Sequence, residues 1–171
     1  KQTAQAKLEE LKLAQEREQR FQKMLQAAKS AFDQQDFIGA MVRASEALGL
    51  KPGDAAAAQL KAQAVEAQDL AAAQARFSQA DYAQAQTLCA KHADGAAFKE
   101  LTARIASEQQ ALADATGRFA NGDYGFVAGL KAQSYAGKKP FAELLAKATT
   151  EAQALAELQG LKQTNNWQAV T

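Results

Sequence analysis

Apolar residues along this chain are spaced for helices. The clearest stripe consists of Phe98, Leu101, Ile105, Leu112 and Phe119, at intervals of 3, 4, 7 and 7 residues. This spacing puts apolar side chains on one face of an α-helix. A leucine recurs at one register position about every 43 residues, as Leu25, Leu70, Leu112 and Leu155. The pattern predicts long amphipathic helices that each bury one stripe.

A short motif, Phe-x-x-x-Asp-aromatic, marks an internal repeat. It occurs at residues 32–37, 77–82 and 119–124, and a fainter copy runs from Gly160 to Trp167. The last aromatic positions of successive copies are 45, 42 and 43 residues apart. A period of this length is typical of stacked helical repeats. We therefore expect one helical-repeat domain over residues 1–171, with repeats at approximately 1–50, 51–92, 93–136 and an incomplete 137–171.

Each repeat is expected to contain a long helix, a tight corner and a shorter helix. Asp36, Asp81 and Asp123 are predicted N-caps, because an aspartate carboxylate accepts backbone N–H groups at a helix start. Asp81 and Gln84 have the spacing of a capping box, and Gly122 suits a corner that needs positive φ. The predicted helices span about 3–34, 37–49, 54–79, 82–92, 95–120, 124–135, 140–163 and 166 onward.

Three features resemble tetratricopeptide repeats. The segment from Ala44 to Ala56, ASEALGLKPGDAA, is similar to the end of that family's second helix and the start of its next unit. Asn121-Gly122-Asp123-Tyr124 resembles the family's turn between helices. Small residues at Ala40, Ala85 and Ala128 resemble its second-helix alanine. The resemblance implies an all-α solenoid of stacked antiparallel helix pairs, here with a longer first helix than in the usual repeat of about 34 residues.

Composition and charge narrow the possible functions. The chain has 20 basic and 19 acidic side chains, a formal net charge of +1, so it lacks the positive field that non-specific nucleic-acid binding requires. The sequence contains no apolar run of about 20 residues, so we predict no membrane insertion. The chain also begins without methionine, inside a helical pattern. We expect a soluble fragment of a longer protein, with the cytoplasm slightly favoured over the periplasm.

Candidate catalytic and metal-binding residues are few. Cys89 and His92 are three residues apart on a predicted helix, but a structural zinc site normally needs four ligands, and the chain has no other cysteine or histidine. The three repeated aspartates are expected to lie too far apart to converge on a site. No phosphate-binding loop or nucleophile elbow is present. We predict no enzyme activity, no metal and no cofactor, although a carboxylate-only or lysine-based site stays open.

Basic residues at equivalent positions provide the candidate binding site. Lys61, Arg104 and Lys147 are 43 residues apart, so stacked repeats would align them in a column able to bind an acidic peptide. The alternative is a solvated helix face balanced by Glu100, Glu108, Glu143 and Glu151. The predicted function is a protein-binding or peptide-binding scaffold.

A second function is open on the sequence. The chain could be a structural spacer or oligomerisation segment of a larger signalling or envelope protein, such as a bacterial kinase, since such proteins often carry repeats of this family. A homodimer would then form through the N-terminal helix, within Lys1 to Phe32, or through the unfinished last repeat at Trp167 and Val170.

Overall fold

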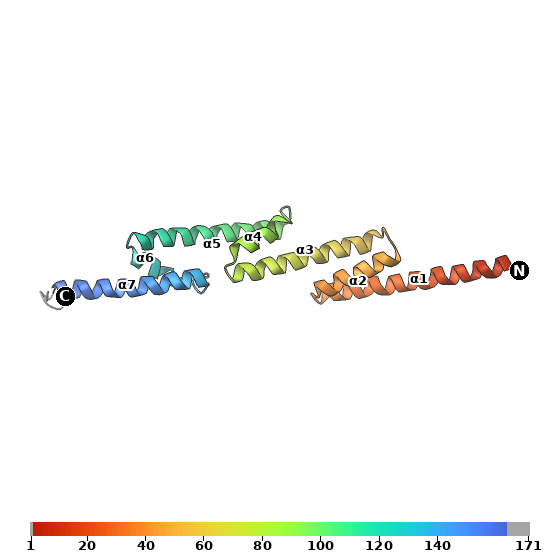
Figure 1. Cartoon of the computed structure of the whole chain (residues 1–171), viewed down its shortest axis with the longest axis horizontal. Coiled ribbons are helices and arrows are strands. Elements are labelled where there is room, and N and C mark those ends of the chain that lie inside the picture. The colour runs from red at the N-terminus through yellow and green to blue at the C-terminus, as the bar shows by residue number, and fades with distance from the viewer. Residues whose placement is uncertain (1, 164–171) are drawn as a thin grey trace. The chain divides into compact units, whose positions relative to one another are not determined.

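All regular structure in the described part of the chain is helical. The computed structural model describes residues 2–163, with side chains for residues 3–162. The helices are α1 (Gln2–Asp33), α2 (Phe37–Leu50), α3 (Ala55–Ser78), α4 (Tyr82–Ala90), α5 (Ala96–Ala120), α6 (Tyr124–Gly129), the 3₁₀ turn η1 (Leu130–Ala132) and α7 (Lys139–Gln163) (Figure 1). Long and short α-helices alternate along the described residues. The predicted all-α class is confirmed, while the fourth corner with Trp167 and Val170 lies outside the described residues.

One helix differs clearly from its predicted bounds. The short helix after Asp123 was expected to reach about residue 135, but α6 ends at Gly129 and one 3₁₀ turn follows. Gly125 and Gly129 lie within a six-residue helix, and each glycine weakens a helix by about 1 kcal/mol relative to alanine. Gln133 then takes an extended conformation, with φ −80° and ψ 148°. The prediction was wrong here because it was based on the apolar residues and did not take these two glycines into account.

The chain divides into two compact units, Lys1–Ala72 and Ala73–Thr171. The first unit contains α1, α2 and most of α3. The second contains the end of α3 and the helices from α4 to α7. The expected single repeat domain stays a prediction, because it concerns how successive repeats stack.

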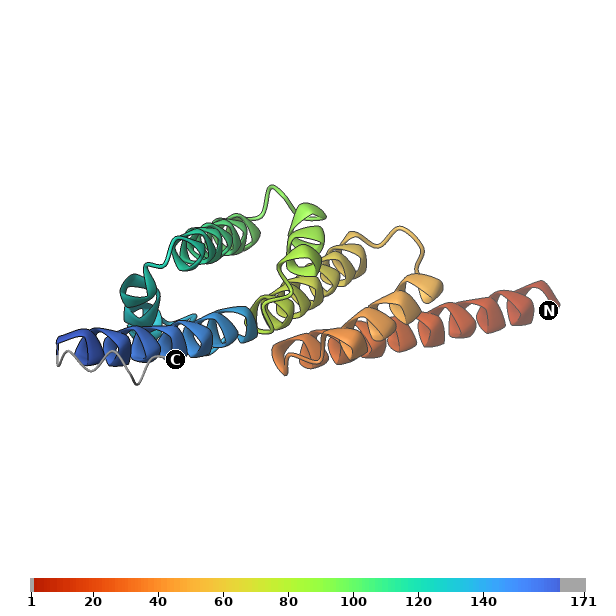
Figure 2. The same ribbon diagram turned by 60° about the vertical axis from the view of Figure 1, so that its left-hand side comes forward.

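The core of the first unit forms where α1 and α2 lie side by side (Figures 1 and 2). One cluster of its buried residues comes from α1, α2 and the start of α3, and consists of Phe21, Leu25, Ala28, Ala44, Ala47, Ala57 and Leu60. A second, smaller cluster consists of Ala31, Ala40 and Ala64. Alanine supplies the contact surface of α2. Small side chains allow helix axes to approach closely, so the larger side chains of α1 fill the space between the helices.

The core of the second unit is built on the predicted apolar stripe of α5. Phe98, Leu101 and Ile105 are buried, whereas Leu112 and Phe119 further along the same helix are only half-buried. Val127, Phe141 and Ala148 are buried as well. On α7, by contrast, Leu155 is 43% exposed. On α5 and α7 the stripe therefore predicts burial best near the N-terminal end of the helix.

Three corners between a long and a short helix share one backbone geometry. Gln35, Ala80 and Gly122 adopt positive φ angles of 62°, 59° and 79°. The next residue at each corner is an aspartate whose backbone N–H donates to a carbonyl five positions earlier, at 2.9, 2.9 and 3.0 Å. This is the Schellman arrangement that closes a helix C-terminus. The positive φ predicted for Gly122 is present, and two non-glycine residues adopt the same conformation.

The same aspartates also begin the short helices. The carboxylates of Asp36, Asp81 and Asp123 accept the N–H of the residue three positions ahead, at 2.9, 3.2 and 3.2 Å. The backbone N–H of Asp81 is already bonded to the Arg76 carbonyl. This N–H is therefore not available for the capping-box hydrogen bond that was expected with the Gln84 side chain. Each aspartate connects the end of one helix to the start of the next.

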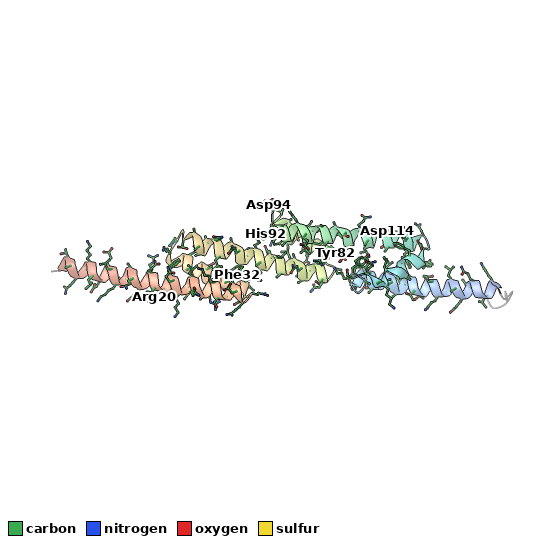
Figure 3. All side chains as sticks on the ribbon, turned by 180° about the vertical axis from the view of Figure 1, so that it is seen from behind. Arg20, Phe32, Tyr82, His92, Asp94 and Asp114 are labelled. Carbon is green, nitrogen blue, oxygen red and sulfur yellow. The ribbon has the colours of Figure 1, made fainter. Side chains whose placement is uncertain are left out.

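An aromatic pair and a cation accompany each corner. The paired rings are Phe32 with Phe37, Phe77 with Tyr82, and Phe119 with Tyr124, with centroid distances of 5.5, 6.2 and 5.3 Å; Figure 3 labels Phe32 and Tyr82. Arg76 pairs with Asp81 at 3.7 Å, and Arg118 with Asp123 at 3.1 Å. Arg43 takes this role for Asp36, at 3.9 Å. The repeated motif is thus a structural corner.

We expect glycine at the left-handed corner positions to stabilise the protein. A non-glycine residue in the left-handed region costs roughly 1–2 kcal/mol. Glycine removes this cost, but its greater conformational freedom in the unfolded chain offsets part of the gain in stability. Ala80→Gly should raise the free energy of unfolding by about 0.5–1 kcal/mol in urea denaturation. Ala83→Gly, inside α4, is the matched control and should lower it by about 1 kcal/mol. Destabilisation by both changes would contradict the assigned corner geometry.

Candidate anion-binding pocket

Arg104 has an uncompensated charge. It projects from α5, and its guanidinium carbon lies 5.0 Å from the ring centroid of Phe77, at the end of α3. None of the ion pairs among the described residues includes Arg104. A guanidinium stacked on an aromatic ring keeps its N–H edge available for hydrogen bonds. Arg104 can therefore offer two parallel donors to a carboxylate.

The nearest expected partner of Arg104 on its own helix is occupied elsewhere. Glu108 is four residues further along α5, a spacing at which opposite charges usually pair. Instead, its Oε2 atom accepts hydrogen bonds from Lys138 Nζ at 2.5 Å and from the Tyr82 hydroxyl at 3.1 Å. The side chains of Lys138 and Glu108 are only 15% and 13% exposed. Lys138 thus neutralises Glu108 and leaves Arg104 unpaired.

The loop before α7 positions Lys138. The backbone N–H of Lys138 donates to the Tyr135 carbonyl at 2.9 Å, and its own carbonyl accepts from Ala142 in the first turn of α7 at 2.9 Å. Its ammonium lies over the Phe77 ring, 3.4 Å from the centroid. Backbone bonds and a cation–π contact therefore fix the lysine at Glu108.

Burial and the contact with Glu108 strongly affect Tyr82. Loss of solvent, together with the hydrogen bond to Glu108 and its charge, raises the pKa of Tyr82 from 10.0 to about 12. Ionising this hydroxyl would remove the donor and place a second negative charge beside the carboxylate. The Tyr82 hydroxyl thus stays neutral well above neutral pH, and it donates a hydrogen bond to the Glu108 carboxylate.

The raised pKa of Tyr82 predicts a loss of stability at high pH. Because the pKa is higher in the folded state, this contribution is complete below pH 10 and is lost as pH rises towards about 12. In wild-type protein the free energy of unfolding should fall over this range, as measured by urea denaturation. Tyr82→Phe should show a shallower fall, whereas identical slopes would contradict the assignment.

These residues surround an open hollow of about 380 Å³. Its lining residues are Phe77, Ser78, Arg104, Glu108, Ser134, Gly137 and Lys138. The ionised groups are two cations and one carboxylate, so the lining carries one excess positive charge. Ser134 adds an exposed hydroxyl, while the Ser78 hydroxyl already donates to the Gln74 carbonyl at 2.9 Å. The hollow is suited to a single anionic group.

The other two residues of the predicted column do not line this hollow. Lys147 is exposed on α7, and Lys61 is exposed on α3 within the first unit. Of the acidic residues proposed to balance the column, Glu108 is bound by Lys138, and Glu143 pairs with Lys139 at 4.0 Å. Neither is ion-paired with Arg104. Of the three basic residues of the predicted column, Arg104 is the one that lines this hollow.

Sequence reasoning missed the part that Lys138 and Tyr82 play at this site. Arg104 and Glu108 have readable helical spacing, so the sequence alone would pair them with each other. Lys138 is 30 residues beyond Glu108, and its approach depends on the turn before α7. Only the packed fold shows that Glu108 is occupied.

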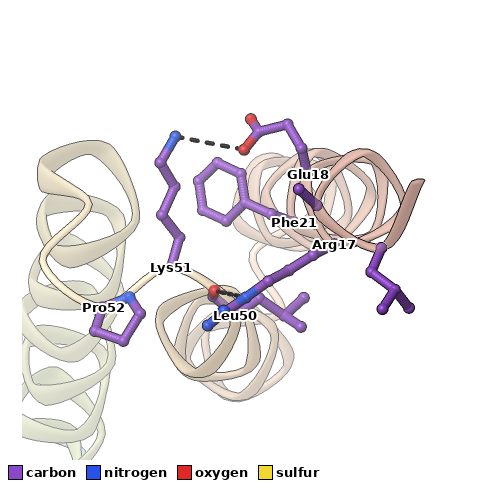
Figure 4. A pocket seen from close by; sticks show the side chains of 8 residues that line it. Arg17, Glu18, Phe21, Leu50, Lys51 and Pro52 are labelled. Carbon is purple, nitrogen blue, oxygen red and sulfur yellow. Dashed lines mark hydrogen bonds and ion pairs between the residues drawn. The ribbon is translucent and has the colours of Figure 1, made fainter. Parts of the chain in front are cut away.

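A second hollow, in the first unit, has cations that are already engaged (Figure 4). This groove of about 520 Å³ lies between α1 and the end of α2. Arg17 Nε donates to the Leu50 carbonyl at 2.6 Å, and Lys51 pairs with Glu18 at 3.6 Å and with Asp54 at 3.9 Å. Lys51 also lies 4.8 Å from the centroid of Phe21. This groove is a weaker candidate for binding an anion than the Arg104 hollow.

Cys89 and His92 occupy structural positions. Cys89 is buried in α4, and the imidazole of His92 stacks on Phe98 with a centroid distance of 4.8 Å. Within residues 2–163, no group of three or more His, Cys, Asp or Glu side chains is arranged to hold a metal ion.

None of the described helices is long and apolar enough to cross a membrane.

No protein-family model, curated protein or solved structure matches this chain. The described residues define an all-helical protein with repeated Asp-capped corners and a cationic surface pocket at Arg104.

Proposed function

We propose that this protein is a non-catalytic helical-repeat scaffold that binds a carboxylate-bearing segment of a protein partner at Arg104. The observation that carries the proposal is the guanidinium of Arg104, stacked on Phe77 without an acidic partner, beside a hollow of about 380 Å³. In this proposal the helix pairs stack as a tetratricopeptide-like solenoid. The repeated corner geometry and the alternation of long and short helices support that arrangement.

The chemistry of the pocket favours binding over catalysis. An acid–base catalyst works best with a pKa near the working pH. Arginine stays protonated in proteins, and the pKa of Tyr82 is raised to about 12. Arg104 and Tyr82 therefore exchange protons poorly near neutral pH, and the other two ionisable groups of the lining, Glu108 and Lys138, are bound to each other. A fixed guanidinium is well suited to hold a carboxylate.

The proposal predicts that Arg104 dominates binding of an acidic peptide. The probe is fluorescein-labelled hexaglutamate, measured by fluorescence anisotropy at low salt, with hexaglutamine as the uncharged control. Arg104→Met should weaken binding about tenfold, because a charge-assisted bidentate contact is lost. Lys139→Met removes the same charge from a side chain that is 84% exposed, and should change affinity less than about twofold. Equal effects of both variants would reject the pocket as the binding site.

The predicted column is tested by the same assay. If stacked repeats align the three basic residues, Lys61→Met and Lys147→Met should each weaken hexaglutamate binding by about two- to threefold. Unchanged affinity in both variants would restrict the site to the pocket at Arg104.

Self-association is a second candidate function, favoured by the exposed first half of α1. Leu8, Leu11 and Leu13 are 54%, 61% and 67% exposed there. An oligomerisation segment would cover such side chains. Light scattering of the whole chain over a concentration series should then show a dimer that dissociates in the Leu8→Ser, Leu11→Ser variant. A monomer at every concentration would exclude this function.

A further inference from the structure

We infer that Lys138 acts as a positioning residue, which keeps Arg104 available for a partner's carboxylate by holding Glu108 away from it. The inference rests on the function proposed above and concerns the same pocket. The role of Lys138 is indirect: the lysine binds the Glu108 carboxylate of this protein, so that Arg104 can bind the carboxylate of the partner.

The first step of the argument is the competition built into α5. Arg104 and Glu108 are four residues apart on one helix, so their side chains can meet without any change of backbone. In the structure, both hydrogen bonds to Glu108 reach Oε2, one from Lys138 and one from Tyr82. Lys138 from the loop before α7, Tyr82 from α4 and Glu108 from α5 are thus joined by hydrogen bonds. Without Lys138, the nearest cation on the same helix is Arg104.

The second step is the difference in exposure between the two cations. Lys138 has a side chain that is only 15% exposed and is enclosed by Phe77 and Glu108. Arg104 is exposed on α5. An incoming carboxylate therefore reaches Arg104 directly, whereas Lys138 is committed to an internal pair. The excess positive charge of the pocket belongs to Arg104.

Removing Lys138 should close the pocket electrostatically. In Lys138→Met the apolar side chain still covers Phe77, but Glu108 loses its cation and can pair with Arg104. Glu108 would also repel an incoming carboxylate at short range. We expect hexaglutamate binding to weaken about fivefold or more in this variant.

A double variant distinguishes this role from direct binding. Lys138→Met with Glu108→Gln has no competing carboxylate, so affinity should return to within about twofold of wild type. If Lys138 bound the peptide itself, the double variant would stay weak, and that result would overturn the inference. Lys139→Met is the charge-matched control one residue away, and an equal loss in that variant would reduce the effect to net charge and also overturn the inference.

A spectroscopic signal reports the pairing directly. The ¹⁵Nε–Hε resonance of Arg104, assigned through Arg104→Met, should shift in Lys138→Met without peptide and return in the double variant. An unmoved resonance would overturn the inference even if affinity fell. Failure of the proposed function would give a different result, because Arg104→Met would then bind hexaglutamate with the same affinity as the wild-type protein.

Discussion

Replacing Phe98 with alanine should lower the free energy of unfolding by about 3–5 kcal/mol, the largest stability effect we expect from one substitution. The Phe98 side chain is 1% exposed at the start of α5, and its ring stacks on His92 at 4.8 Å. Alanine would remove this burial and leave a cavity that neighbouring helices fill only in part. Guanidinium denaturation followed by far-ultraviolet circular dichroism measures the change.

Two further variants make this expectation specific. Phe98→Leu retains much of the buried apolar volume and should cost less than Phe98→Ala. Leu158→Ala removes a large apolar side chain that is 43% exposed on α7, so it should change stability by only about 0.5 kcal/mol. A cost for Leu158→Ala equal to that of Phe98→Ala would show that the two positions are buried alike, against the structure.

The position of Phe98 could be predicted from the sequence because helix periodicity is a local property. Phe98, Leu101 and Ile105 recur at intervals that define one helix face, and all three are buried. The aspartates at the corners were predictable for a similar reason, since capping involves backbone groups within three residues. Local rules thus placed most helices and the corners between them.

Conflicting local preferences limited the same reasoning. Gly122 indicated a left-handed corner, but Gln35 and Ala80 adopt the same conformation without glycine. The Schellman bonds and aromatic contacts around these residues offset the strain. In α6, two glycines shortened a helix that its apolar residues had predicted to be longer. Hydrogen bonds and aromatic contacts between residues five positions apart decided the first case, and the backbone preference of glycine decided the second.

The candidate site was predictable only in part, because it depends on contacts between distant segments. Periodicity selected Arg104 as a basic residue that recurs at repeat spacing. It could not show that Lys138 approaches Glu108, since the turn before α7 sets that approach. The most informative feature of the pocket is therefore a helical ion pair that the sequence favours and the fold does not form.

The ion pair between Lys138 and Glu108 gives the second large effect that we expect, on stability in the absence of any ligand. Lys138→Met should lower the free energy of unfolding by about 2–3 kcal/mol, because it leaves a mostly buried carboxylate without its cation. This cost is below that of a fully buried pair because Glu108 keeps the Tyr82 hydrogen bond and is 13% exposed. Urea denaturation at neutral pH measures the loss.

Combining Lys138→Met with Glu108→Gln should recover most of this stability, since a neutral amide needs no cation and can still accept the hydrogen bond from Tyr82. A double variant as unstable as Lys138→Met would mean that the lysine stabilises the loop mainly through its contact with Phe77. Full recovery would mean that Lys138 is needed there only because Glu108 is charged. A residue that serves only to neutralise Glu108 is what a pocket with a free Arg104 requires.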